Sequence, residues 1–208
     1  VKVKLEVLPA YMSAPAAMAD DAIEIHPGTP NVYFEQQTNK GEPTGPIMEK
    51  VAYTAEGEYY LQRQPHLTVE PDVGLAYFDD EGRLTIHSKS IGIHLHHAMI
   101  APGLGIEPEK LRLIQNAAGG TFGYKFSPTM EALLGVACMA TGRPVFLRYN
   151  YAQHMTYTGK RSPFWLKLKM GADKDGRIVA MEGDWSVDHG PYSEFGDLLT
   201  LRGNQYVG

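Results

Sequence analysis

Three glycines stand within five positions of one another in the stretch AAGGTFGYKFSP, residues 117–128. Glycine loses more conformational freedom on folding than any other residue, so Gly119, Gly120 and Gly123 weaken a fold unless something approaches the backbone closely. Main-chain N–H groups ahead of a helix N-terminus favour an anion or an oxo group. The glycine loop, residues 119–123, is therefore predicted to bind a ligand; the alternative is a loop that only lets a strand and a helix pack tightly.

Other candidate motifs point to structural roles. The loop lacks the G-x-G-x-x-G spacing of a dinucleotide site, and no phosphate-binding G-x-x-x-x-G-K-[ST] is present. Of His94, His96 and His97, only the first and last share a helix face, and no carboxylate lies at a matching spacing. A partly buried polar face is favoured over a metal site. Cys138 lies in an apolar helix, which favours a buried, unreactive thiol.

Several acidic residues are candidate functional sites by their type. Glu70 is a candidate acid or base by its type alone, but a hydrogen-bonded loop carboxylate is favoured because no partner stands at a readable spacing. Asp173 and Asp175 suit the first and third positions of a calcium loop, yet Ile178 occupies the position where glycine is required. That segment is predicted to be a turn. The segment 190–203, taken alone, is more typical of a buried loop than of a substrate wall.

The composition of the 208-residue chain describes a globular protein, with 43% hydrophobic and 21% charged residues. The formal net charge of -5 argues against nucleic acid as a partner, because phosphate binding needs a concentrated excess of Lys and Arg. No apolar run approaches the roughly 20 residues of a membrane helix, so no membrane partner is expected. A single cysteine excludes an internal disulfide and any four-cysteine cluster within the chain.

The elements that must position the loop follow from the residue pattern. The first 50 or so residues predict a connection with one short helical piece. Alternation over 73–77 and 84–88 predicts a hairpin that turns at 79–82. A second hairpin is predicted to run from 165–170 through the turn DKDG to 178–187.

Two helices are predicted between the hairpins. The first begins at Ser90 and is stopped by Pro102; the second has Ser127 as N-cap, Pro128 at its first position and Gly142 as C-terminal cap. The buried face of the second is predicted to contain Met130, Leu133, Leu134, Ala137 and Cys138. Strands in LRLIQNA and RPVFLRYNY flank this helix. The chain is therefore predicted to be α+β (mixed α/β), with hairpins and a β-helix-β unit that carries the glycine loop.

Five segments together resemble the molybdenum hydroxylases, the xanthine oxidase family, and among them the bacterial molybdenum-iron-sulfur aldehyde oxidoreductases. The segments are RQPHLTVEPDV, NAAGGTFGYKFSPTMEALL, ATGRPVFLRYNY, TGKRSPF and DHGPYSEFGDLLTLRG. The resemblance implies that residues 1–55 form a connecting segment and the end of the preceding domain. Residues 56–208 would be the first part of the first molybdopterin-binding domain, and the chain an internal fragment of a longer enzyme, inactive when expressed alone.

The resemblance also implies roles for individual residues. The segment whose main-chain amides approach the oxo ligand and the pterin dithiolene corresponds to Gly119, Gly120, Thr121, Phe122 and Gly123. A hydrophobic substrate channel would be lined by Phe126, Phe195 and Leu198. The catalytic glutamate base and the cluster cysteines belong to other segments of the family, so no catalytic residue and no direct metal ligand is expected in this chain. Where purine-oxidising relatives tend to carry glutamine, 31 positions before Phe122, the chain has Ile91.

The reaction implied is oxidation of an aldehyde to a carboxylic acid, with water as the oxygen donor. The implied cofactor is molybdenum-molybdopterin in its cytosine dinucleotide form, with two [2Fe-2S] clusters held by other parts of the parent protein. The implied partners are an electron-acceptor protein and a second copy of the parent enzyme, in the cytoplasm or alternatively the periplasm. Two alternatives stay open: oxidation of an N-heterocycle such as a purine, and a non-catalytic structural module.

Overall fold

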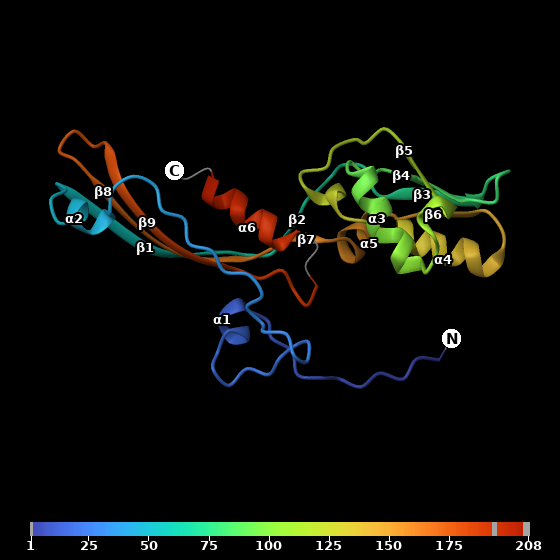
Figure 1. The fold of residues 1–208 in the computed structure, drawn as a ribbon, viewed down its shortest axis with the longest axis horizontal. Helices are drawn as coiled ribbons and strands as arrows, with labels where there is room; N and C mark the ends of the chain where they lie inside the picture. The colour runs from blue at the N-terminus through green and yellow to red at the C-terminus, as the bar shows by residue number, and fades with distance from the viewer. Residues whose placement is uncertain (1, 193–194, 206–208) are drawn as a thin grey trace. The chain divides into compact units, whose positions relative to one another are not determined.

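The chain is divided by its internal contacts into two compact units, shown in a computed structural model that describes residues 2–192 and 195–205 (Figure 1). Residues 1–63 and 162–208 make up the hairpin unit, and residues 64–161 make up the sheet unit. Both contain helices and strands with open sheets. The predicted mixed α+β fold class is confirmed.

The hairpin unit is built on a three-stranded antiparallel sheet in the order β1-β8-β9. Its strands are β1 (Tyr53–Leu61), β8 (Phe164–Ala172) and β9 (Ile178–Val187). The unit also holds the helices α1 (Ala14–Ala17), α2 (Thr44–Met48) and α6 (Gly196–Gln205). The predicted hairpin is confirmed, and so is its turn, because Asp173 Oδ1 accepts the amides of Asp175 and Arg177 at 2.9 Å each.

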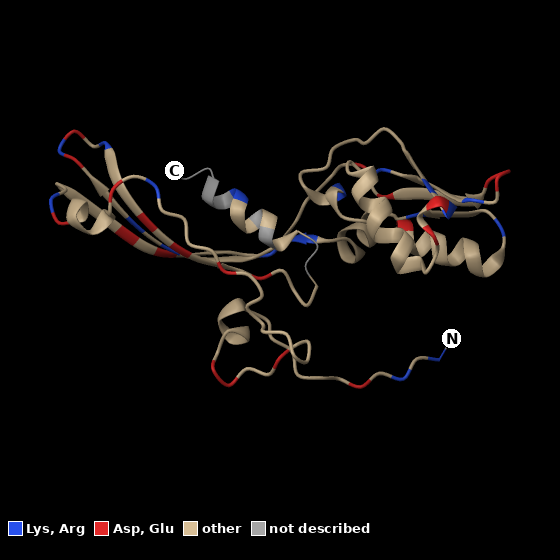
Figure 2. Cartoon of the chain, in the orientation of Figure 1, with Lys and Arg blue, Asp and Glu red and all other residues tan. Residues whose placement is uncertain are grey.

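Side chains on the surface of the hairpin unit are of mixed kinds. Acidic and basic residues are interspersed along the sheet (Figure 2), and Glu58 and Lys167 face each other across β1 and β8 with 3.3 Å between Oε1 and Nζ.

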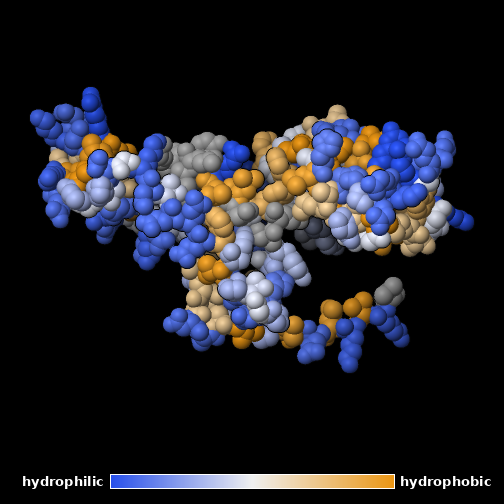
Figure 3. Space-filling view, in the orientation of Figure 1, coloured by the Kyte–Doolittle hydropathy of each residue, from blue (hydrophilic) through white to orange (hydrophobic). Residues whose placement is uncertain are grey.

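The N-terminal segment is extended, and apolar side chains are exposed along it (Figure 3). Val3, Leu5 and Val7 are 72%, 83% and 94% exposed. Within the described residues, no helix has the length and apolar character needed to cross a membrane.

The sheet unit is built on a four-stranded mixed sheet in the order β5-β4-β3-β6. Its strands are β3 (Val73–Phe78), β4 (Leu84–Ser88), β5 (Leu111–Gln115) and β6 (Val145–Arg148). β3 runs antiparallel to β4 and β6, whereas β4 and β5 are parallel. β2 (Gln64–Pro65) and β7 (Lys160–Arg161) pair separately. The predicted strands on both sides of the second helix therefore share one sheet, at its two edges.

The helices of this unit are α3 (Ile93–Leu104), α4 (Glu131–Thr141) and α5 (Tyr151–Tyr157), with 3-10 turns η1 (Pro108–Lys110) and η2 (Tyr124–Phe126). One apolar core joins α3 and α4 to the sheet; its buried members are Ala76, Leu84, Ile86, Ile100, Ala101, Leu111, Met130, Leu134 and Cys138. Burial raises the pKa of the Cys138 thiol, as an unreactive core cysteine requires.

The buried face of α4 differs from the prediction at two positions. Leu133 is 55% exposed and Ala137 is only half-buried, whereas Gly135, which was not predicted, is buried. A Cβ on Gly135 would stand 2.8 Å from Leu104 Cδ1, so a larger residue here would require the Leu104 side chain of α3 to move. Helix α4 turns the face that contains Gly135 toward α3. The periodicity of apolar residues does not indicate this, because it does not show where a neighbouring helix packs.

The predicted ends of α3 were wrong. The helix begins at Ile93 and not at Ser90, because the hydroxyls of Ser88 and Ser90 accept the amides of Ser90 and Gly92 in a preceding turn. It also continues through Pro102 to Leu104. Proline costs little in a last turn, and the left-handed residue that ends the helix is Gly105, with φ +68°.

The predicted start of α4 was also wrong. Ser127 is extended, and the helix begins at Glu131. Glu131 Oε2 accepts the amides of Thr129 (2.7 Å) and Met130 (3.1 Å), so the helix caps itself with a carboxylate from its own first residue. The predicted C-terminal cap is confirmed: Gly142 is left-handed at φ +63°.

Replacing Glu131 with alanine is expected to loosen α4. Its other oxygen accepts Ser88 Oγ at 2.5 Å, and the side chain is buried, so the change would leave three donors unsatisfied. The expected cost is about 2 kcal/mol in the free energy of opening the helix, or about thirtyfold faster hydrogen exchange of the α4 amides. Glu109→Ala, an exposed glutamate of the same unit, is the matched control, and equal exchange in the two variants would contradict the capping role.

Candidate functional site

The glycine loop makes use of the conformational freedom of its glycines. Gly120 and Gly123 have φ angles of +107° and +94°, which side chains other than glycine rarely adopt. Phe122 between them is also left-handed, at φ +52°, and is 62% exposed. The predicted neighbourhood of a helix N-terminus is not found, because η2 separates the loop from α4, whose leading amides bind Glu131.

The carbonyl groups and the amide groups of the loop differ in how they are bonded. The carbonyls of Thr121, Phe122 and Gly123 accept from Tyr124 N (3.0 Å), Arg161 Nη2 (3.4 Å) and Phe126 N (3.4 Å), respectively. Over residues 2–192 and 195–205, no acceptor takes the amides of residues 120–123. Residues 121–123 therefore present amide donors while their carbonyls are engaged, which is the donor set that an oxo group or a dithiolene would need. The residues present fit such a group.

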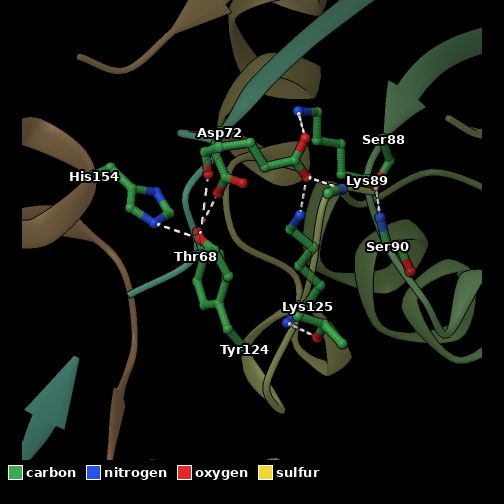
Figure 4. Close-up of polar contacts among 11 residues, drawn as sticks. Thr68, Asp72, Ser88, Lys89, Ser90, Tyr124, Lys125 and His154 are labelled. Carbon is green, nitrogen blue, oxygen red and sulfur yellow. Dashed lines mark hydrogen bonds and ion pairs between the residues drawn. The ribbon is translucent and has the colours of Figure 1, made fainter. Parts of the chain in front are cut away.

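One carboxylate fixes both ends of this loop (Figure 4). Glu70 Oε1 accepts the amide of Gly119 at 2.7 Å and also the ammonium group of Lys125. Glu70 Oε2 accepts Lys89 Nζ at 2.6 Å. The prediction that Glu70 is a hydrogen-bonded loop carboxylate is confirmed. Its partners were not predicted, since they stand 19, 49 and 55 positions away in the chain.

The charge on Glu70 is stabilised by its donors. Burial of the carboxyl group by itself raises its pKa, but the hydrogen bonds from the two ammonium groups and the Gly119 amide outweigh burial and lower the pKa from 4.5 to about 2. The Lys125 side chain is 2% exposed and that of Glu70 24%, so the pair is largely removed from water. Glu70 is therefore an anion at neutral pH.

Stability should depend on this carboxylate in acid. The lowered pKa contributes stability that is present above pH 4.5 and is lost as the pH falls from 4.5 toward 2. The difference in melting temperature between wild type and Glu70→Gln, in the metal-free full-length protein, should be largest above pH 5 and shrink through that window. Titration of the other groups is common to both proteins and cancels. A difference that stays constant from pH 7 to pH 3 would contradict the assignment.

A second set of buried polar side chains, separate from the Glu70 cluster, connects Tyr124 with Asp72 and Thr68 with His154. The Tyr124 hydroxyl donates to Asp72, and burial together with this bond raises the pKa of Tyr124 well above its usual value. Thr68 Oγ1 and His154 Nε2 are 3.0 Å apart, and burial lowers the pKa of His154 (Figure 4). These residues were missed in the sequence. The only local signal was the pair of carboxylates flanking a proline in VEPDV.

The histidines of α3 have structural partners. His96 is fully buried, with Nε2 2.6 Å from Phe126 O, and His97 Nε2 lies 3.0 Å from Leu111 O. His94 is exposed. No cluster of three or more His, Cys, Asp or Glu in the described part of the chain could hold a metal ion. Ile91 lies at the loop, since its amide donates to Lys125 O at 3.2 Å.

The three predicted channel residues fall in different units. Phe126 ends η2 in the sheet unit and is 42% exposed. Phe195 directly precedes α6, and Leu198 lies in its first turn, 41% exposed; both belong to the hairpin unit. The expected helical turn around Leu198 is present, while the adjoining residues 193 and 194 lie outside the described chain. The convergence of the three side chains stays a prediction.

Comparison with known proteins identifies the family. Residues 25–208 match the family described as the molybdopterin cofactor-binding domain. The chain is 67% identical over all 208 residues to the aldehyde oxidoreductase of Megalodesulfovibrio gigas, of which it spans 23%. It is 27% identical to the nicotinate dehydrogenase large molybdopterin subunit of Eubacterium barkeri, spanning 97% of this chain and 47% of that protein.

Solved structures agree with the sequence comparison. The crystal structure of the aldehyde oxidoreductase of Desulfovibrio desulfuricans superposes on the whole chain with a TM-score of 0.90 and 67% identity, and the chain covers 23% of it. Quinoline 2-oxidoreductase of Pseudomonas putida 86 shares the fold, with a TM-score of 0.72 at 21% identity over 92% of this chain and 24% of that one. The family expected from the five sequence segments is confirmed. This chain belongs to the molybdopterin cofactor-binding domain family.

Proposed function

We propose that the glycine loop holds the oxo and dithiolene side of a molybdopterin cofactor through its main-chain amides. The observation that carries the proposal is a contrast within the loop: the carbonyls of residues 121–123 are bonded, whereas the amides of residues 120–123 have no acceptor in the part of the chain that the structure describes. Phe122 and the left-handed Gly120 and Gly123 expose these amides without side chains that would compete for them. The assignment covers Gly119, Gly120, Thr121, Phe122 and Gly123, of which Gly119 opens the loop with its own amide on Glu70 and the other four supply the amides.

We further propose that the chain is part of a molybdenum-dependent aldehyde oxidoreductase. Support comes from the 67% identity to an aldehyde oxidoreductase over the entire chain. Bound molybdenum-molybdopterin supplies the redox chemistry, converting an aldehyde and water to a carboxylic acid with two electrons passed on. The residues of this chain hold the cofactor, shape the approach of the aldehyde and exclude water. Ile91, with its amide on Lys125 O, offers a substrate no hydrogen bond from its side chain, which favours an aldehyde over a purine.

The wider assignments rest on the same relatives. We propose that Phe126, Phe195 and Leu198 line the substrate channel, that residues 1–55 connect to a preceding domain, and that residues 56–208 begin the molybdopterin-binding region. The cofactor is proposed in its cytosine dinucleotide form. Two [2Fe-2S] clusters would be held by other parts of the parent protein, because such clusters need several cysteine ligands and this chain has one. A homodimer in the cytoplasm, with an electron-acceptor protein as partner, completes the proposal.

The experiment is to purify the full-length enzyme, measure its molybdenum content, and compare turnover of benzaldehyde and xanthine. The expected result is near one molybdenum per chain and a kcat/KM for benzaldehyde at least about a hundredfold above that for xanthine. Faster turnover of xanthine would replace the aldehyde assignment with the N-heterocycle alternative. A full-length protein without molybdenum would reject both.

A further inference from the structure

We propose that Glu70 is a positioning residue, which clamps the two ends of the glycine loop on one carboxylate and so keeps the amides between them available for a ligand. The inference deepens the proposed function and rests on it, since it concerns the same loop. The proposed role requires no contact of Glu70 with cofactor or substrate. Glu70 acts through Gly119 and Lys125.

The Glu70 carboxylate accepts donors from separate parts of the chain. The donors on Glu70 come from three separate segments: Lys89 follows β4, Gly119 opens the loop, and Lys125 lies in η2 just after it. Glu70 Oε1 accepts from both Gly119 N and Lys125 Nζ. A single oxygen atom therefore joins the start of the loop to the turn that follows it.

The Glu70 carboxylate also leaves little room for a side chain at Gly119. A Cβ at Gly119 would stand 3.0 Å from both Cδ and Oε2 of Glu70, closer than real side chains normally come. A Cβ at Gly123 would meet nothing nearer than His66 Nε2 at 3.9 Å. A side chain at Gly119 would press on the Glu70 carboxylate, whereas Gly120 and Gly123 are favoured by their positive φ angles. Glycine is therefore favoured at these positions for two different reasons: a close contact at Gly119, and a positive φ at Gly120 and Gly123.

The contacts at Gly119 and Lys125 leave the main-chain amides of residues 120–123 available to a ligand. Lys125 is held at its backbone too, because its amide donates to Thr121 Oγ1 (3.1 Å) and its carbonyl accepts Ile91 N (3.2 Å). With Gly119 and Lys125 both fixed, the amides of residues 120–123 cannot turn inward to find acceptors. Two lysines surround one glutamate, so the charge of the Glu70 carboxylate is balanced within this cluster. The remaining carboxylates nearby have other partners: Asp72 binds Tyr124, and Glu131 binds Ser88 and the start of α4.

The test compares hydrogen exchange of residues 119–125 in full-length wild type, Glu70→Gln, Glu70→Asp and Glu81→Gln. Glutamine keeps an acceptor but loses the charge, whereas aspartate keeps the charge but is one methylene too short to reach every donor. Both Glu70 variants should exchange about tenfold to a hundredfold faster in this segment, because bonds to a charged, largely buried carboxylate are lost. Glu81→Gln removes an exposed glutamate of the same unit, 71% exposed and paired with Arg83, and should match wild type.

A second readout separates positioning from general stability. In the metal-loaded enzyme, Glu70→Gln should alter the molybdenum(V) paramagnetic resonance spectrum and lower kcat more than it changes KM, while Glu81→Gln alters neither. Loop exchange at the wild-type rate in both Glu70 variants would overturn the proposal. So would a lower melting temperature with exchange raised uniformly across the sheet unit, which describes a merely structural residue. Should Glu70→Gln fail to fold, Glu70→Asp decides by the same criteria.

Failure of the clamp can be told apart from failure of the proposed function. Hydrogen exchange in the metal-free full-length protein tests the clamp without reference to molybdenum. Wild-type enzyme that contains no molybdenum and oxidises no aldehyde would reject the proposed function even if the Glu70 variants loosen the loop. Wild-type enzyme that is active, together with Glu70 variants whose loops exchange normally, would reject the clamp alone.

Discussion

Gly123→Val in the full-length enzyme is expected to abolish aldehyde turnover, by more than about a hundredfold, and to release molybdenum. Two effects act at this position. Valine is strained at the φ of +94° that Gly123 adopts, and its branched side chain would stand beside the amides proposed to hold the cofactor. Within the described chain the space is open, since His66 Nε2 at 3.9 Å is the nearest atom to an added Cβ.

Gly142 offers a matched control for the strain. It is also left-handed, at φ +63°, its added Cβ would meet nothing within 4 Å, and it caps α4 at the end opposite to the loop. Gly142→Val should therefore lower the melting temperature while leaving molybdenum and turnover intact. Loss of metal in Gly123→Val beyond the loss in Gly142→Val would report the ligand, because the backbone penalty is common to both.

An asparagine pair sharpens the comparison, since asparagine tolerates positive φ better than other residues with a Cβ. Gly142→Asn should be close to wild type. Gly123→Asn should fold but still hold less molybdenum, because its side chain occupies the approach to the loop. A Gly123→Val enzyme that is unstable yet fully loaded with metal would reject contact between this residue and the cofactor.

Short-range chemistry made much of the fold predictable. The turns DDEGR and DKDGR were found correctly because each begins with an aspartate that accepts amides two and four positions on. Asp79 Oδ1 accepts from Glu81 and Arg83 at 3.1 and 2.9 Å, the same pattern that Asp173 shows in the second turn. Alternating strands on either side then form the two hairpins. These interactions are complete within five residues, so the sequence alone contains them.

Helix ends were less predictable because they depend on competing caps. Ser127 and Pro128 are good starting residues, yet the carboxylate of Glu131 satisfies the leading amides three residues later. Helix α5 was not anticipated, although Asn150 and Gln153 form a reciprocal capping box that is visible in the sequence as N-x-x-Q. Choosing among several plausible caps requires knowing which backbone groups the tertiary structure buries.

The candidate site shows the same limit more strongly. The glycine loop was located from the density of glycines, which is a local signal. Glu70 was noticed only by its type, because Lys89 and Lys125 reach it through the packing of β4 and η2 and not through any spacing in the chain. The sequence attributed the glycine at position 119 to the approach of a ligand, whereas in the structure the group that lies against it is a carboxylate of the same chain.

Phe126→Ala is expected to change which aldehydes the enzyme prefers while leaving the fold intact. The backbone of Phe126 is held from both sides, by Gly123 O on its amide (3.4 Å) and by His96 Nε2 near its carbonyl (2.6 Å). The side chain is 42% exposed, so truncation removes a ring that is only partly buried. An apolar channel wall that loses a ring should accept bulkier aldehydes. The ratio of kcat/KM for benzaldehyde to that for acetaldehyde should shift by about 1 to 3 kcal/mol, or about 10- to 200-fold.

Phe146→Ala is the control, because Phe146 lies on β6 and is 65% exposed, and the ratio should stay at its wild-type value there. An unchanged ratio in Phe126→Ala would remove this residue from the channel.

The shared wall can be tested by a double-mutant cycle of Phe126→Ala with Leu198→Ala, residues that belong to different units of the chain. Changes at independent sites add, whereas side chains that line one narrow channel interact, because removing either already admits the larger substrate. The combined shift in the benzaldehyde to acetaldehyde ratio should therefore be smaller than the sum of the single shifts by at least about 0.5 kcal/mol. Strict additivity would place Phe126 and Leu198 in separate surroundings and reject the common wall, even if each variant alone alters the preference.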